Sequence, residues 1–187
     1  LGQRLNGIKA AARIGVVRPL TYLLPIVLCS KPRRHRGIIM TQSGVIGRPK
    51  NELDTPVLML DLEVLERNIA YMSDVILRQA GVGWRPHTKG MKTPALAHKL
   101  LAAGAHGVTC AKLGEAEVMA YAGVRDILVA NQVVGKRKID RLVNLQPHSD
   151  VAVIVDDLDN VLEIDAAARA KGVRVRVLIE VDVGMGR

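Results

Sequence analysis

The sequence predicts an α/β fold in which parallel strands alternate with helices. Six short apolar runs recur at intervals of roughly 20 to 25 residues from Thr55 onward, and segments with helical periodicity separate them. Continuous apolar runs of about five residues are typical of parallel strands that are covered on both faces. Two architectures remain open at this point, an incomplete (β/α)8 barrel of about six βα units or a doubly wound open sheet.

The apolar runs and the segments between them give the expected elements in order. Strands are expected over residues 56–60, from Trp84 up to Lys89, and over 107–111, 127–130, 151–155 and 173–181. Helices are expected over residues 62–79, 94–103, 114–121, 136–145 and 158–170. Asp61 is suited to cap the first helix, because its carboxylate can accept a first-turn N–H. Thr93 followed by Pro94 suits the start of the second helix, and Gly104 suits its end.

Residues 1–39 carry the excess positive charge of the chain. They contain eight of the 27 Lys and Arg residues and no acid, which leaves 19 basic and 18 acidic residues for 40–187. We expect this basic leader to be disordered or to be an upstream extension of the reading frame, with Met40 as the natural start. A transit or signal peptide is the second interpretation, although the apolar run of about ten residues is too short to span a bilayer. A basic arm is the third.

Composition excludes several classes of partner and site. With three Tyr, one Trp and no Phe, the chain lacks an aromatic stacking platform, so we expect no nucleic-acid partner. No run is long enough for a membrane span. The only cysteines are Cys29 and Cys110, so we expect no structural disulfide, a reducing compartment and a cytoplasmic protein. The histidines show no metal-ligand spacing, so no metal residue is assigned.

Lys89 is the first candidate for chemistry. Its strand would deliver it to the carboxyl end of the sheet, where α/β folds keep their sites. A lysine is nucleophilic only when its amine is neutral, and Arg85, His87 and Lys92 could supply the positive field that favours that form. A lysine pair beside a loop is also a common solvated surface. Spacing alone does not decide between the two.

Four blocks of sequence resemble the D-threonine aldolase and D-serine dehydratase-like proteins. They are residues 85–89, 107–117, 126–135 and 180–187. These proteins share the alanine racemase N-terminal barrel and carry pyridoxal 5'-phosphate (PLP) as fold type III enzymes. The resemblance, which extends over residues 54–187, implies that residues 40–187 are the N-terminal part of an incomplete (β/α)8 TIM-type barrel, truncated at its C-terminus. It also implies that Lys89 binds PLP as a Schiff base.

The resemblance implies a PLP-dependent lyase. The reaction would be retro-aldol cleavage of a β-hydroxy-D-amino acid to glycine and an aldehyde. A D-serine dehydratase-like enzyme, a non-catalytic PLP-binding protein and an inactive fragment are the alternatives. The complete enzyme would be a homodimer that acts on a small D-amino acid, and its divalent metal would be bound by ligands that this chain does not contain.

Four further residues are predicted to bind the cofactor. The resemblance places Arg187 beside the PLP phenolic oxygen, where a guanidinium stays charged and gives two hydrogen bonds. His87 alternates with Lys89 along the strand and could keep the lysine neutral or carry a proton, unless it is a structural histidine. Asn131 and Gln132 end the fourth expected strand and could contact the cofactor or cap a helix.

Three other features of the sequence bear on the site and its surroundings. Met91 stands where the family commonly has the histidine of Lys-x-His-Lys, which puts the orientation of the substrate in doubt. Cys110 lies in an apolar strand and is expected to be a buried, inert thiol. Lys112, Glu115 and Glu117 are expected to form a salt-bridged loop and helix start.

Overall fold

The computed structural model describes residues 47–186, and the chain divides into two units, Leu1–Thr55 and Pro56–Arg187. The described part of the first unit contains one short 3₁₀ helix, η2 (Lys50–Glu52), which buries none of its residues. The basic leader at residues 1–39 and the predicted site residue Arg187 both lie outside the described residues.

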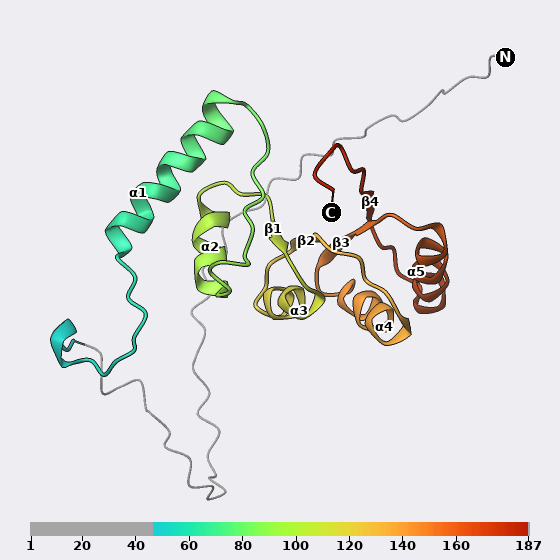
Figure 1. The fold of residues 1–187 in the computed structure, drawn as a ribbon, viewed down its shortest axis with the longest axis horizontal. Helices are drawn as coiled ribbons and strands as arrows, with labels where there is room; N and C mark the ends of the chain where they lie inside the picture. Colours follow the sequence, from blue (N-terminus) through green and yellow to red (C-terminus); the bar gives the residue numbers. More distant parts are fainter. Residues whose placement is uncertain (1–46, 187) are drawn as a thin grey trace, which may run out of the picture. The chain divides into compact units, whose positions relative to one another are not determined.

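The second unit alternates helices with parallel strands (Figure 1). Its helices are α1 (Leu62–Ser73), the π-helix η3 (Asp74–Gln79) that continues it, α2 (Pro94–Ala102), α3 (Leu113–Tyr121), α4 (Lys136–Leu145) and α5 (Leu158–Lys171). Its strands are β1 (Val108–Cys110), β2 (Asp126–Val129), β3 (Asp150–Val155) and β4 (Val177–Ile179). Within residues 47–186, no helix is long and apolar enough to cross a membrane.

The four strands form one parallel sheet in the order β1-β2-β3-β4. This order follows the sequence, as it does in a (β/α)8 barrel. A doubly wound sheet instead reverses its strand order at a switch point and places helices on both faces. The observed order therefore supports the incomplete barrel over the open sheet.

Helices α3, α4 and α5 cover one face of the sheet (Figure 1), so the expectation of cover on both faces is wrong for the described part. Alternate strand residues such as Val108, Ile127 and Val151 are fully buried against these helices. Their neighbours Thr109 and Leu128 are paired across the sheet and are only partly buried. Alternation along each strand explains this difference, because successive side chains point to opposite faces.

The two N-terminal predicted strands differ from expectation. Residues 56–60 form no strand and their side chains are exposed, because an apolar run becomes a strand only when a neighbour takes its backbone hydrogen bonds. The segment from Trp84 to Thr88 lies parallel to β1 but makes only one bridge, His87 to Thr109. Its Trp84 carbonyl also accepts the His106 N–H at 3.1 Å, and the Trp84 side chain is 7% exposed.

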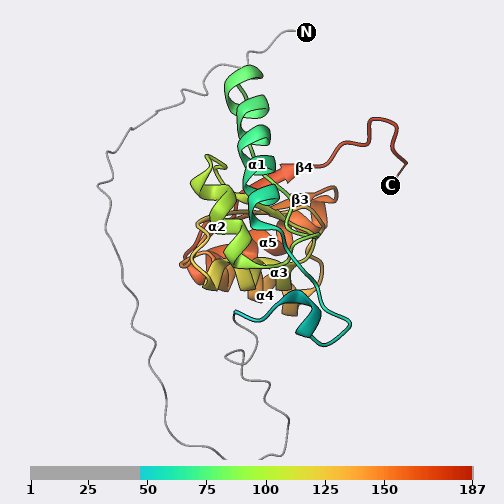
Figure 2. The same cartoon turned by 90° about the vertical axis from the view of Figure 1, so that its left-hand side faces the viewer.

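Helix α1 begins at Leu62 as the sequence predicts, but the expected helix over residues 62–79 is divided into α1 and η3, and α1 buries none of its residues. The Asp61 side chain accepts the Val64 N–H at 3.0 Å and so caps its start. Ser73, the last residue of α1, donates from its hydroxyl to the carbonyl of Ala103, which follows α2, at 2.7 Å. Figure 2 shows α1 projecting beyond the other elements of this unit.

An ion-pair network joins the amino ends of the strands. Asp126, the first residue of β2, receives hydrogen bonds from Arg85 at 2.8 Å and from Arg176 at 2.6 Å. Arg176 also binds Asp150, the first residue of β3, at 2.8 Å. Burial opposes ionisation of Asp126, but the two arginines outweigh it and hold the pKa of this carboxyl below its ordinary value.

Substitution of Gly107 by alanine should destabilise the fold. An added Cβ would lie 2.5 Å from the Asp126 carbonyl oxygen and 2.5 Å from the Arg85 Nη1 atom, so backbone must move. We expect Gly107→Ala to lower the free energy of unfolding by about 1–3 kcal/mol in urea denaturation.

Gly114→Ala is the matched control, because the nearest atoms to its added Cβ are 3.9 Å away. It lies in α3, where alanine in place of glycine is neutral or stabilises by up to about 1 kcal/mol. Equal stability of the two variants would contradict the close approach at Gly107.

Candidate functional site

The carboxyl ends of the parallel segments meet at one edge of the sheet. The residues that follow these ends form what we name the carboxyl edge: Lys89, Ala111, Asn131, Gln132, Asp156 and Glu180. Polar side chains from elements far apart in the sequence thus come together there. This is the end of the strands at which (β/α)8 barrels carry their active sites.

Lys89 lies in a short turn that starts from a firm anchor. The preceding residue, Thr88, is fully buried, and its N–H donates to the Thr109 carbonyl of β1 at 2.8 Å. The Lys92 N–H closes the turn by donating to the Thr88 carbonyl at 2.8 Å. The Lys89 side chain is exposed, and its amine contacts no carboxylate of residues 47–186 within ion-pair distance. Lys89 thus follows the segment in which a strand was expected, although that segment makes only one bridge to β1.

His87 lies next to Lys89 and has a defined tautomer. Its Nδ1 atom accepts the Lys89 backbone N–H at 3.1 Å, so the proton of the neutral ring is on Nε2. Burial lowers the pKa of His87, and the ammonium groups of Lys89 and Lys92 lower it further, while the Glu115 carboxylate opposes them. The lowered pKa therefore keeps Nδ1 available as an acceptor down to a lower pH than in an ordinary histidine.

Asn131 and Gln132 connect the ends of neighbouring strands. The Asn131 amide donates to the Ala111 carbonyl at 3.3 Å, and its oxygen accepts the Gln132 N–H at 3.0 Å. The Gln132 amide nitrogen donates to Asp156 at 2.8 Å and to Glu180 at 2.9 Å. Both predicted residues thus lie on the same edge as Lys89, with side chains that already bind their neighbours.

Glu115 connects the turn of Lys89 to β1, a contact that the sequence did not reveal. Its Oε1 atom binds the Lys92 ammonium at 2.6 Å, and its Oε2 atom accepts the Ala111 N–H at 2.8 Å. The bond from Lys92 lowers the pKa of Glu115 in spite of burial. The expected salt-bridged helix start therefore exists, but with other partners, because Glu117 binds Arg141 rather than Lys112.

The structure does not support the role expected of Arg85, but it agrees with the role expected of Cys110. Arg85 binds Asp126 at the amino end of β2, so it does not supply positive charge at Lys89 as the sequence suggested. Cys110 is a buried free thiol, and burial raises its pKa, which agrees with an inert role. The other cysteine of the chain, Cys29, lies outside the described residues.

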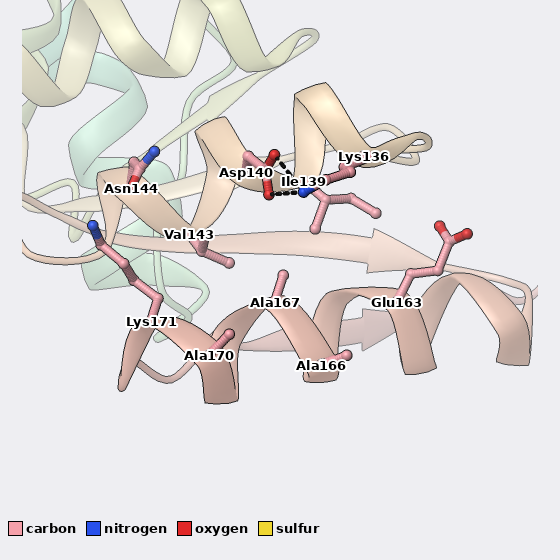
Figure 3. Close-up of a pocket in the computed structure, with 10 residues that line it drawn as sticks. All are labelled: Lys136, Ile139, Asp140, Val143, Asn144, Glu163, Ala166, Ala167, Ala170 and Lys171. Atoms are coloured by element: carbon pink, nitrogen blue, oxygen red, sulfur yellow. Dashed lines mark hydrogen bonds and ion pairs between the residues drawn. The ribbon is translucent and has the colours of Figure 1, made fainter.

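Two hollows lie near these elements. A hollow of about 240 Å³ adjoins the carboxyl edge and is lined by Asn131 and Gln132 together with Lys112, Lys138 and Arg141. A larger one, of about 690 Å³, lies between α4 and α5, and no residue of the carboxyl edge lines it (Figure 3). Among residues 47–186, no group of three His, Cys, Asp or Glu side chains is placed to hold a metal ion.

Several known proteins are similar to this chain in sequence or in structure. The chain is 39% identical over 152 residues to the D-threonine aldolase of Arthrobacter sp., covering 81% of this chain and 40% of that protein. The crystal structure of D-threonine aldolase from Filomicrobium marinum has 42% identity and a TM-score of 0.70, and the match covers 72% of this chain and 36% of that chain. D-threo-3-hydroxyaspartate dehydratase from Delftia sp. HT23 has 35% identity and a TM-score of 0.66, with 73% and 36% covered.

The chain spans about two fifths of the length of the curated relatives it matches. Residues 60–187 match the family described as alanine racemase, N-terminal domain. This match covers all four strands of the sheet and the turn that holds Lys89. It confirms the resemblance that the four sequence blocks indicated. The chain therefore belongs to the alanine racemase N-terminal domain family.

Proposed function

We propose that this chain is the N-terminal part of a PLP-dependent lyase that cleaves a β-hydroxy-D-amino acid to glycine and an aldehyde. The observation that carries the proposal is the position of Lys89, an exposed amine on a buried anchor at the carboxyl edge of the sheet. The likeness to two D-threonine aldolases supports the same reaction.

The residues at the carboxyl edge fit PLP chemically. A Schiff base needs a primary amine that is not held by an acid, and no carboxylate within the described residues binds Lys89. We propose Lys89 as the attachment point, with His87, Asn131 and Gln132 around the cofactor and with Arg187 beside its phenolic oxygen. When bound, PLP supplies an electron-poor ring that stabilises negative charge at the substrate Cα.

His87 would serve this site as a proton carrier. Its Nδ1 atom is held by the Lys89 N–H, so exchange with a bound molecule would take place at Nε2. Its lowered pKa favours the neutral ring, so His87 does not add to the positive field that would help to keep Lys89 neutral. A neutral lysine is the form that attacks a carbonyl carbon.

A dehydratase is the second candidate, favoured by the likeness to the Delftia D-threo-3-hydroxyaspartate dehydratase. Both reactions begin with a β-hydroxy-D-amino acid and differ in which bond to its carbon skeleton breaks. In the complete protein, which we infer to be a homodimer, a divalent metal would polarise the substrate hydroxyl as a Lewis acid. Its ligands are assigned to no residue of this chain.

Lys89→Ala should abolish the visible absorption of lysine-bound PLP. The purified chain is mixed with PLP, reduced with borohydride and digested, and the peptide that carries the cofactor is identified by mass spectrometry. We expect the wild type to be labelled at Lys89, because the family assigns this chemistry to one lysine. Lys112→Ala, which removes another exposed lysine near the same edge, should retain the label. Labelling spread equally over several lysines would contradict the proposal.

The products from D-threonine separate the two reactions. Formation of glycine and acetaldehyde, followed by chromatography and an aldehyde-coupled assay, is expected for an aldolase. A keto acid with ammonia would instead establish the dehydratase. The assay is made on the complete protein, because this chain spans about two fifths of its relatives.

Lys92→Met should raise the pKa of His87 toward its ordinary value. Loss of the ammonium removes one cause of the lowered pKa and frees the Glu115 carboxylate, which acts in the opposite direction. The shift will be partial, because burial is the largest cause and remains. Histidine C–H resonances followed by NMR against pH, assigned with His87→Gln, measure it.

Lys99→Met is the control for this titration, since Lys99 binds Glu66 at 2.6 Å and does not influence His87. A His87 titration that is unchanged by Lys92→Met would show that the two groups do not interact.

A further inference from the structure

The turn that carries Lys89, residues 88–92, makes few bonds of its own. After the Thr88 anchor, the backbone bond that closes the turn runs from the Lys92 N–H to the Thr88 carbonyl. Lys92 has a φ of 51°, the only positive φ of a residue other than glycine within residues 47–186. This left-handed conformation is unfavourable for a residue that carries a side chain. Such strain persists where surrounding contacts hold it.

Glu115 supplies the contact that holds the turn from outside. Its side chain is 16% exposed, and its two oxygens bind two separate groups, the Lys92 ammonium at 2.6 Å and the Ala111 N–H at 2.8 Å. Its own N–H donates to the Lys112 carbonyl at 3.0 Å, which fixes it in the first turn of α3. A carboxylate is favoured there by the helix dipole.

Because Glu115 binds two groups, its contact with Lys92 differs from an ordinary ion pair at the surface. An exposed pair holds two mobile side chains and contributes little to stability. Here one partner is mostly buried and is bonded to the backbone directly after β1, so the carboxylate fixes the end of the Lys92 side chain relative to the sheet. The turn is thus tied at Thr88 to the middle of β1 and at Lys92 to the residue after β1.

We propose that Glu115 is a positioning residue, which keeps the turn of Lys89 in one conformation at the carboxyl edge. The proposal rests on the proposed function of Lys89 as the PLP lysine. Glu115 acts through Lys92 and the backbone and touches neither cofactor nor substrate. Its loss loosens the turn and leaves the sheet and α3 folded.

Trypsin cleavage after Lys89 in the purified chain without PLP tests this role. Cleavage requires the turn to open, so Glu115→Gln should increase the rate at Lys89 about fivefold, the effect of weakening one charged contact by roughly 1 kcal/mol. Lys92→Met removes the same ion pair from the other side and should give a similar increase. The double variant should be cleaved at Lys89 little faster than either single variant, because both changes remove the same interaction.

Glu117→Gln is the matched control, because Glu117 lies on the same helix but binds Arg141. It should leave cleavage at Lys89 unchanged, and none of the variants should accelerate cleavage after Arg125, which directly precedes β2. Cleavage at Lys89 within twofold of the wild type in both Glu115→Gln and Lys92→Met overturns the positioning role. Faster cleavage at both sites would show general unfolding and also overturns it.

A second measurement distinguishes this proposal from the one on which it rests. Glu115→Gln should slow the borohydride-trapped labelling of Lys89 by PLP, while Glu117→Gln labels at the wild-type rate. If PLP labels another lysine of the wild-type chain, the proposed function of Lys89 is wrong. The positioning role that rests on this function is then also wrong, whatever the cleavage rates are. Labelling of Lys89 that Glu115→Gln leaves unchanged overturns the positioning role alone.

Discussion

The position of Lys89 depends on two backbone hydrogen bonds to one residue of β1. The Thr109 N–H donates to the Pro86 carbonyl at 2.8 Å, and the Thr109 carbonyl accepts the Thr88 N–H at 2.8 Å. These bonds align the segment before Lys89 parallel to the sheet although it is too short to count as a strand. Buried backbone groups must be paired, so the chain has little freedom to place Thr88 elsewhere. Everything that follows Thr88 in the turn starts from this fixed point.

The two ends of the strands are stabilised in different ways. At the amino ends, Asp126 and Arg176 belong to a network of charged side chains. At the carboxyl edge, uncharged amides from Asn131 and Gln132 make the links between neighbouring strands. The Arg85–Asp126 pair is partly buried, so loss of one of its charges leaves the other without its partner, whereas an amide can exchange one partner for another.

Much of the fold could be predicted from the sequence, because local signals decide it. Asp61 caps a helix as expected, and the apolar runs at β1, β2 and β3 became parallel strands. Residues 56–60 could not be judged in this way, since a strand exists only where a second strand accepts its hydrogen bonds. The sequence shows which residues favour a strand, but not whether a partner is present.

The candidate site was predictable in part for the same reason. Lys89, Asn131 and Gln132 follow strands directly, so the topology brings them to one edge. Glu115 was missed as a partner of Lys92, because these residues are 23 positions apart and only the packing of α3 beside the turn brings them together. Arg85 was misplaced because alternation along a strand predicts a face but not which end of the sheet a long side chain reaches.

The buried Trp84 gives this protein a built-in optical reporter. It is the only tryptophan of the 187 residues, and it lies five positions before Lys89 in the segment that delivers that lysine to the sheet. Tryptophan fluorescence of the whole chain thus comes from one side chain, without contributions from other indoles. Its emission will follow the docking of that segment specifically, so detachment of this segment can be told apart from melting of the sheet measured by circular dichroism.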